Sequence, residues 1–131
     1  MIESTGVKEG NMGYSDLVHE LVLEHVRKKL SREYKDVAVN RKGEKKAQYE
    51  GYYPDVILGN HGIVLALLEI ETADTLSEKQ AETWKAMSSL GVKVIVMIPK
   101  ELRMRVTDLL WSKGIMDRVS VGTYEIAVHM P

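Results

Sequence analysis

Apolar residues recur along this chain with two different periods, which predict helices and strands. Residues 14–30 carry apolar side chains about every three or four positions, as expected of an amphipathic helix. The helical period returns over residues 76–90 and 101–111. Apolar runs that predict strands occupy residues 37–39, 52–58, 63–71, 92–98 and 119–128.

The predicted order is helix, three strands, helix, strand, helix, strand. Three consecutive strands followed by crossover helices imply an α/β fold with a mixed sheet of four to five strands, flanked by helices. The run at residues 63–71 is apolar on both faces, as expected near the centre of a covered sheet. Residues 59–62 read Gly-Asn-His-Gly, a turn signal that predicts a hairpin between the second and third strands.

Composition limits the class of protein. The chain has 131 residues, 44% hydrophobic and 28% charged, which predicts a single globular domain over residues 1–131, with 1–13 as a loose tail. It has no cysteine, which excludes disulfides and fits a reducing, cytoplasmic location. No apolar stretch is long enough to cross a bilayer, so we expect no membrane partner. The net charge of −1 means that nucleic-acid binding would need a local basic patch.

Three acids interrupt the two predicted strands of the hairpin. Strand alternation places Glu69 and Glu71 on one face, and the hairpin brings Asp55 near Leu67 or Glu69. Clustered carboxylates repel one another and raise their pKa values, and a divalent cation relieves this repulsion. Mg²⁺ or Mn²⁺ is therefore the predicted cofactor. The alternative is that these acids are simply solvated at a strand end. Alternation also assigns three apolar residues to the face of Glu69: Ile63, Leu65 and Leu67.

The motif Pro54-Asp55, thirteen residues, then Glu69-Ile70-Glu71 resembles that of the PD-(D/E)XK nuclease superfamily. The resemblance implies a restriction-endonuclease-like core and hydrolysis of phosphodiester bonds. It implies that Asp55, Glu69 and the carbonyl of Ile70 bind the metal ion, and that Asp55, Glu69 and Glu71 are catalytic. Glu71 stands where the family usually has lysine. Some type II restriction enzymes also have glutamate at this position.

Two helical residues extend the resemblance. Glu20 is similar to the helix glutamate that many members use as a further metal ligand; the alternative is a solvated surface residue. Gln80 precedes Trp84 by four positions, similar to the Gln-x-x-x-Tyr motif of RecB-like members, and is a further catalytic candidate. Lys79 is the nearest candidate for a displaced catalytic lysine, but a plain surface lysine is the preferred interpretation.

A basic segment precedes the strand of Asp55 and is the best candidate for binding phosphates. We expect the partner to be DNA, branched or duplex. A homodimer is expected as well, because cutting both strands requires two sites. The predicted nucleic-acid-binding residues are Arg41, Lys42, Lys45 and Lys46.

Three hypotheses follow from the sequence. The first is a small metal-dependent endonuclease. The second is a nuclease fold without catalysis, serving as a nucleic-acid-binding or protein-interaction module. The third is an α/β protein of unrelated function whose acids are solvated.

Overall fold

The computed structural model describes residues 13–127, and in this part of the chain it confirms the predicted order of elements. The predicted tail lies outside the described residues except for Gly13. None of the helices between residues 13 and 127 has the length and apolar character needed to span a membrane. The elements are α2 (Tyr14–Leu30), β1 (Asp36–Val39), β2 (Val56–Asn60), β3 (Ile63–Ile70), α3 (Glu78–Ser88), β4 (Lys93–Pro99), the 3₁₀ turn η1 (Lys100–Leu102), α4 (Arg103–Lys113) and β5 (Val119–Tyr124).

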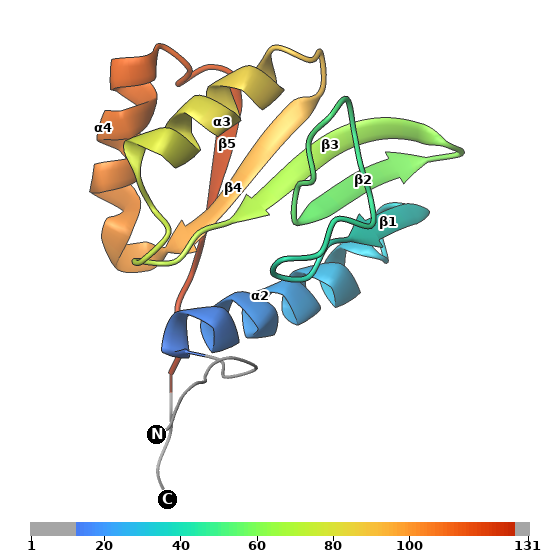
Figure 1. Ribbon diagram of the computed structural model, residues 1–131, viewed down its shortest axis with the longest axis horizontal. Helices are drawn as coiled ribbons and strands as arrows, with labels where there is room; N and C mark the ends of the chain where they lie inside the picture. Colours follow the sequence, from blue (N-terminus) through green and yellow to red (C-terminus); the bar gives the residue numbers. More distant parts are fainter. Residues whose placement is uncertain (1–12, 128–131) are drawn as a thin grey trace, which may run out of the picture.

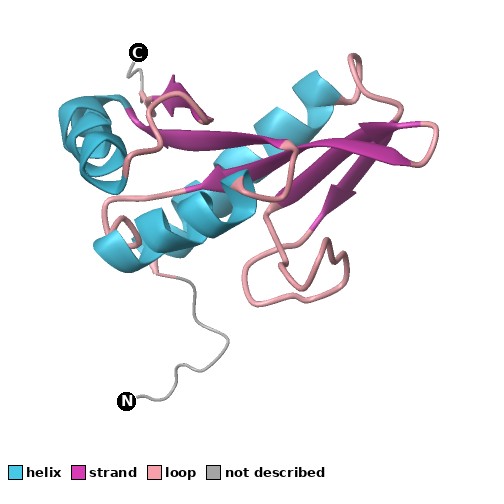
Figure 2. Ribbon diagram, turned by 90° about the horizontal axis from the view of Figure 1, so that it is seen from above, coloured by secondary structure: helices cyan, strands magenta, loops and turns pink. Residues whose placement is uncertain are grey.

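The five strands form one mixed sheet in the order β1-β2-β3-β4-β5 (Figure 1). The β1–β2 and β2–β3 pairs are antiparallel, whereas the β3–β4 and β4–β5 pairs are parallel. The parallel strands are joined by α3 and α4, as parallel pairing requires a crossover. Helices lie on both sides of the sheet in Figure 2, with α2 on one face and α3 and α4 on the other.

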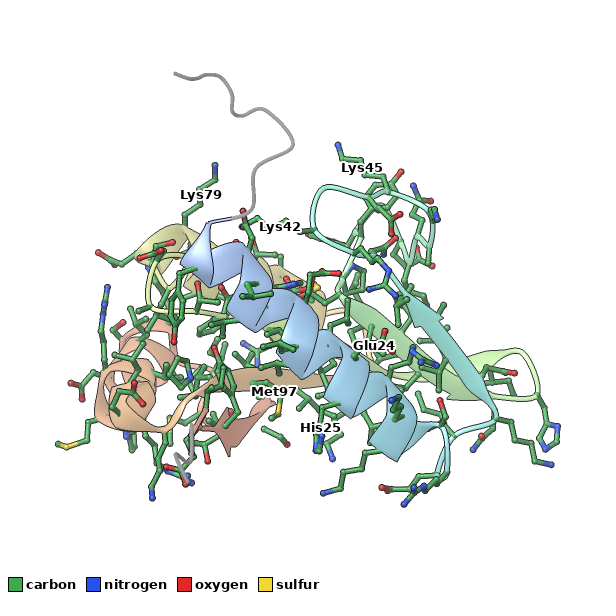
Figure 3. The ribbon with its side chains drawn as sticks, turned by 90° about the horizontal axis from the view of Figure 1, so that it is seen from below. Glu24, His25, Lys42, Lys45, Lys79 and Met97 are labelled. Carbon is green, nitrogen blue, oxygen red and sulfur yellow. The ribbon has the colours of Figure 1, made fainter. Side chains whose placement is uncertain are left out.

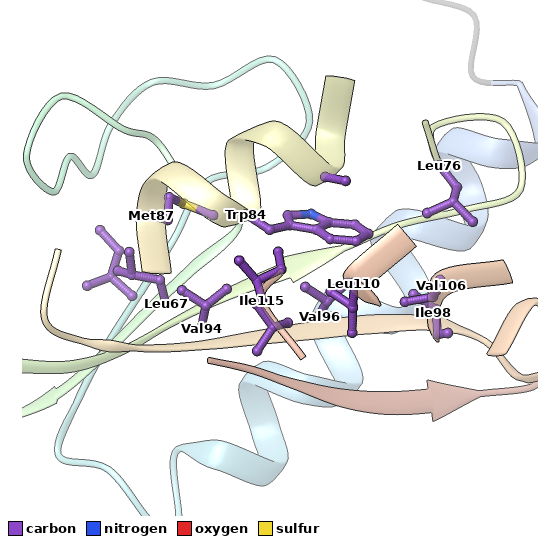
Figure 4. Close-up of a cluster of buried hydrophobic side chains, with 13 residues drawn as sticks. Leu67, Leu76, Trp84, Met87, Val94, Val96, Ile98, Val106, Leu110 and Ile115 are labelled. Atoms are coloured by element: carbon purple, nitrogen blue, oxygen red, sulfur yellow. The ribbon is translucent and has the colours of Figure 1, made fainter. Parts of the chain in front are cut away.

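The core beneath α3 and α4 is built around Trp84 (Figure 4). Its side chain has no exposed surface and packs among buried residues from β3, β4 and α4, including Leu67, Val96 and Leu110. A buried indole N–H requires a hydrogen-bond partner. This requirement links the core to the acids at the end of β3, because the indole donates to Glu71.

A β-bulge changes the predicted alternation along β3. Leu58 pairs with Ala66 but Gly59 pairs with Val64, so Leu65 is an extra residue on β3. An extra residue shifts the phase of the side chains. Val64 therefore packs on the same core as Leu67, although strict alternation would place these two residues on opposite faces. Leu65 itself is 43% exposed.

The predicted apolar stripe of α2 also differs from the observed one. Leu17 and Leu21 match the helical period, but they are 49% and 54% exposed. The buried face carries Val18, His19, Val22, Leu23 and Val26. Val18, Val22 and Val26 were expected from the helical period, whereas the burial of His19 accompanies a polar contact described below.

We predict that Gly59→Ala destabilises the fold, because the added Cβ would collide with the backbone carbonyl of Ile63. Overpacking of this kind costs about 1–3 kcal/mol in the free energy of unfolding. Gly122→Ala is the matched control, since its Cβ would meet the movable end of the Met97 side chain and a smaller loss is expected. Urea denaturation of both variants measures the difference; equal losses would contradict the backbone clash.

Candidate functional site

The hairpin brings Asp55 and Glu69 together. Val56 pairs with Leu68, so Asp55 lies opposite Glu69. The backbone N–H of Asp55 donates to Oε2 of Glu69 at 3.0 Å, and the backbone N–H of Ile70 donates to Oδ2 of Asp55 at 2.7 Å. Each carboxylate is thus held by the main chain of the opposite strand, which confirms the predicted pairing of these two acids.

The pair opens into a cleft of about 220 Å³ beside the long β1–β2 loop. The cleft is bounded by the C-terminal end of β3, by α2 and by residues from the start of α3. Its polar lining includes His19, Arg41, Lys42, Asp55, Glu69, Glu71 and Gln80.

Glu71 lies at the same cleft as Asp55 and Glu69, but its carboxylate is engaged by other partners. It is only 1% exposed, and its carboxylate accepts hydrogen bonds from Thr75 (2.7 Å), Gln80 (2.8 Å) and Trp84 (3.2 Å). In residues 13–127, no group of three or more acidic or histidine side chains has the geometry of a metal site. All three acids line the cleft, but donors in and just before α3 engage both oxygens of Glu71.

Gln80 and Trp84 act as a pair on α3. Residues four apart lie on one face of a helix, so both side chains reach the same oxygen of Glu71, Oε2. The partner that a glutamine on a core stripe requires is thus Glu71. In this arrangement Gln80 orients an acid of β3 and makes no described contact with Asp55 or Glu69.

The main chain of Glu71 is fixed as firmly as its side chain. Its N–H donates to the carbonyl of Met97 on β4, and its carbonyl accepts from the Tyr124 hydroxyl at 2.7 Å. Burial and the charges of Glu101 and Glu71 raise the pKa of Tyr124 to about 12, so the phenol stays protonated and keeps donating. The end of β3 is therefore tied to β4, β5 and α3.

His19 is the site residue that the sequence analysis missed. It is 6% exposed, and its Nε2 lies 3.0 Å from Oδ1 of Asp55, which can only accept. Its Nδ1 is buried without a hydrogen-bond partner, 3.5 Å from the Glu20 carboxylate. Burial lowers the pKa of His19, but hydrogen bonds and charges of Asp55 and Glu20 outweigh it, and the net pKa is raised. A signal in the sequence that could have identified His19 is its position directly after Val18, one of the apolar residues of the helical period.

Glu20 faces the β1–β2 loop. Its carboxylate accepts from the Arg41 guanidinium at 2.9 Å and from the backbone N–H of Lys42 at 3.4 Å. Its part in metal binding stays a prediction, since its two oxygens are engaged by the loop. What Glu20 does here is fix the loop against α2 at the rim of the cleft.

The basic residues of the loop are paired within the protein, and two of them, Arg41 and Lys42, line the cleft. Arg41 bridges Glu20 and Glu24, and hydrogen bonds from Arg27 and Arg41 lower the pKa of Glu24 to about 2. Exposed ion pairs contribute about 0–1 kcal/mol, so phosphates can compete for these cations. The other pairings are Lys42 with Asp16 (2.7 Å), Lys46 with Glu44 (3.1 Å) and Lys45 above the ring of Tyr53 (5.7 Å).

Asn40 gives the loop its shape. It is 2% exposed, and its amide donates to the carbonyls of Ala47 and Pro54 while its oxygen accepts from the N–H groups of Lys46 and Ala47. Figure 3 shows Lys42 and Lys45 on this side of the molecule and Lys79 extending outward from α3. Lys79 is exposed, as the surface interpretation predicted.

Two carboxyl groups of the site resist ionisation. Burial, followed by the charge of Asp55, raises the pKa of Glu69 well above its usual value, although the Asp55 N–H opposes this shift. Burial also raises the pKa of Glu71, despite three donors that favour its charged form. Burial therefore favours the neutral form of both acids, and a positive charge at the cleft would favour their ionised form.

No protein-family model matches this sequence, and no curated protein is significantly similar to it.

We predict that Glu71→Gln increases the free energy of unfolding more at pH 8 than at pH 5. A carboxyl whose pKa is raised on folding stabilises the fold below its unfolded pKa and loses this contribution as pH rises through the folded pKa. Glutamine removes the penalty, and its amide can donate to Thr75 while its oxygen accepts from Gln80 and Trp84. Denaturant titrations at both pH values measure the effect.

Glu82→Gln on the same helix is the control. Lys113 lowers the pKa of Glu82, so removing that charge should give no gain at pH 8. A Glu71→Gln variant that is equally destabilised at both pH values would show that the charge itself is required.

Proposed function

We propose that this protein is a divalent-metal-dependent nuclease of the PD-(D/E)XK type that hydrolyses phosphodiester bonds of DNA. The observation that carries the proposal is the pairing of Asp55 and Glu69 across the β2–β3 hairpin, each held by the other's strand, at a cleft with a basic rim. The order of elements and the crossover from β3 through α3 to β4 support the restriction-endonuclease-like core that the motif implies.

The paired acids fit a Mg²⁺ or Mn²⁺ ion. Mg²⁺ keeps several waters and often takes only one or two protein carboxylates, so Asp55 and Glu69 suffice, with the Ile70 carbonyl as a further ligand. Burial and the charge of Asp55 raise the pKa of Glu69, and a bound cation would stabilise its ionised form. Among the described residues, no hydrogen bond reaches Oε1 of Glu69, which leaves that oxygen to a ligand. Such an ion activates water and neutralises charge on the phosphate.

The chain's own residues position this pair. The imidazole of His19 holds Oδ1 of Asp55, and the N–H of Ile70 holds Oδ2, so the aspartate has one orientation. Glu71 anchors the strand end through Thr75, Gln80 and Trp84. Arg41 and Lys42 would face incoming phosphates at the cleft, with Glu20 and Asp16 as their respective intramolecular counter-ions.

A second candidate is a nuclease fold that binds nucleic acid or a protein without cleaving. The observation that favours it is the state of Glu71, which replaces the motif lysine and has both oxygens engaged by protein donors. Lys79 is exposed on α3 and does not replace the missing amine.

We predict that Glu69→Gln abolishes Mn²⁺-dependent cleavage of a panel of branched, single-stranded and duplex DNA. The rate should fall by more than about 100-fold, beyond the 10- to 100-fold typical of residues that only orient a ligand. Glu82→Gln, an acid-to-amide change on the outer part of α3, is the control and should keep wild-type activity. Calorimetry with Mn²⁺ should show binding that tightens as pH rises, because Glu69 must lose its proton first.

The outcomes separate the two candidates. If the wild type binds DNA but does not cleave it at every pH tested between 6 and 9, the result supports a nuclease fold without catalysis. Absence of both Mn²⁺ binding and DNA binding contradicts both.

We predict that Lys42→Ala and Lys45→Ala each weaken DNA binding in the same way for all sequences. Each lost phosphate contact should reduce the slope of log affinity against log salt by about 1. Lys35→Ala, beside β1 and outside the cleft, is the control and should leave the slope unchanged. Fluorescence anisotropy over a salt series measures this, and an unchanged slope for the loop variants would place the contact elsewhere.

A further inference from the structure

The outer side of α2 carries an apolar stripe with no partner in the described chain. Tyr14, Leu17 and Leu21 are 77%, 49% and 54% exposed. They are spaced at i, i+3 and i+7 and so lie along one side of the helix. Isolated exposed apolar residues are ordinary, but a contiguous apolar surface marks an interaction site.

The stripe borders a groove of about 540 Å³ between α2 and the β4–β5 part of the sheet. Leu21 and Val26 form part of one wall, while Leu68, Ile95 and Met97 belong to the sheet. The groove is lined mostly by apolar side chains because α2 covers only part of this face.

This groove is separate from the cleft of Asp55 and Glu69. Figure 3 shows Met97 and His25 on one flank of α2 and Lys42 and Lys45 on the opposite flank. A partner that occupies the groove therefore leaves the cleft open.

Charges are distributed unevenly along the groove. The end near the C-terminus of α2 is lined by His25 and Lys29. The other end leads to a hollow of about 320 Å³ beside Tyr14, whose lining includes three acids. From residue 14 to residue 29 the helix rises about 22 Å, which places Leu21 near the middle. The acids are Asp74, Glu101 and Glu125.

We propose that this surface binds a second copy of the chain through a two-fold axis that passes close to Leu21. A two-fold contact uses the same patch on both subunits, so the patch must be complementary to itself. The two-fold rotation reverses α2, which brings the basic end of one copy to the acidic end of the other. Lys29 then faces Glu125 of the partner subunit, and the apolar stripes meet at the centre.

The same pattern disfavours other occupants. DNA would meet three acids at one end of the groove, where phosphates are repelled. A small apolar ligand would cover the groove but leave Leu17 and Tyr14, which lie outside its lining, exposed. The inference does not rest on the proposed chemistry, and its test does not use cleavage.

The first test is the oligomeric state of the full chain by sedimentation velocity and light scattering. We expect a dimer at about 100 μM and a more than tenfold weaker association for Leu21→Glu. Leu21 is already half exposed, so its thermal melting should change little. Met104→Glu on α4, at a residue 80% exposed and outside the groove, is the control and should remain dimeric. A monomeric wild type, or a Met104→Glu variant that dissociates equally, overturns the proposal.

The second test exchanges the charges. Lys29→Glu and Glu125→Lys should each weaken the dimer about fivefold or more, and the double variant should restore it to within about twofold, because the two charges then attract again. Restoration supports the antiparallel two-fold arrangement. If the two substitutions weaken the dimer additively in the double variant, the arrangement is overturned. The same result is expected if the dimer forms through another surface.

Discussion

The buried carboxylate of Glu71 joins the two halves of the molecule. It receives donors from Thr75, Gln80 and Trp84, so it satisfies the indole N–H at the centre of the α3–α4 core. Its backbone is bonded in turn to β4 and to Tyr124. Because β3 cannot shift without breaking these bonds, the position of Glu69 two residues earlier is fixed by the packing of distant helices. An unpaired charge is costly in such a place, and the donors offset much of that cost.

The candidate site is held together against electrostatic repulsion. Asp55 and Glu69 lie side by side in a partly buried cleft, and the pKa of Glu69 is raised as a result. His19 contacts Asp55, and this contact with that of Glu20 raises the pKa of the imidazole against the opposing effect of burial. Ionised acids crowded in this way oppose stability unless positive charge or hydrogen-bond donors compensate them.

Unequal covering of the sheet produces the two surfaces of the molecule. Two helices, α3 and α4, pack on one face of the sheet, whereas α2 alone packs on the other. One flank of α2 adjoins the loop and the acids, and the opposite flank leaves an apolar groove over β4 and β5. A single helix placed along a five-stranded sheet thus separates the candidate chemistry from the surface proposed for self-association.

The order of elements, the hairpin and a place for Asp55 near Leu67 or Glu69 could be predicted from the sequence, because they follow from local periodicity and from residues counted outward from one turn. The three-dimensional packing was needed to choose Glu69, and to reveal the bulge at Leu65, the burial of His19, the exposure of Leu17 and Leu21, and the partners of the Glu71 side chain. These features depend on hydrogen-bond partners and packing surfaces from segments far apart in the chain. Alternation places Glu71 on the face of Glu69, but it is the indole of Trp84, thirteen residues later, that draws its carboxylate into the core.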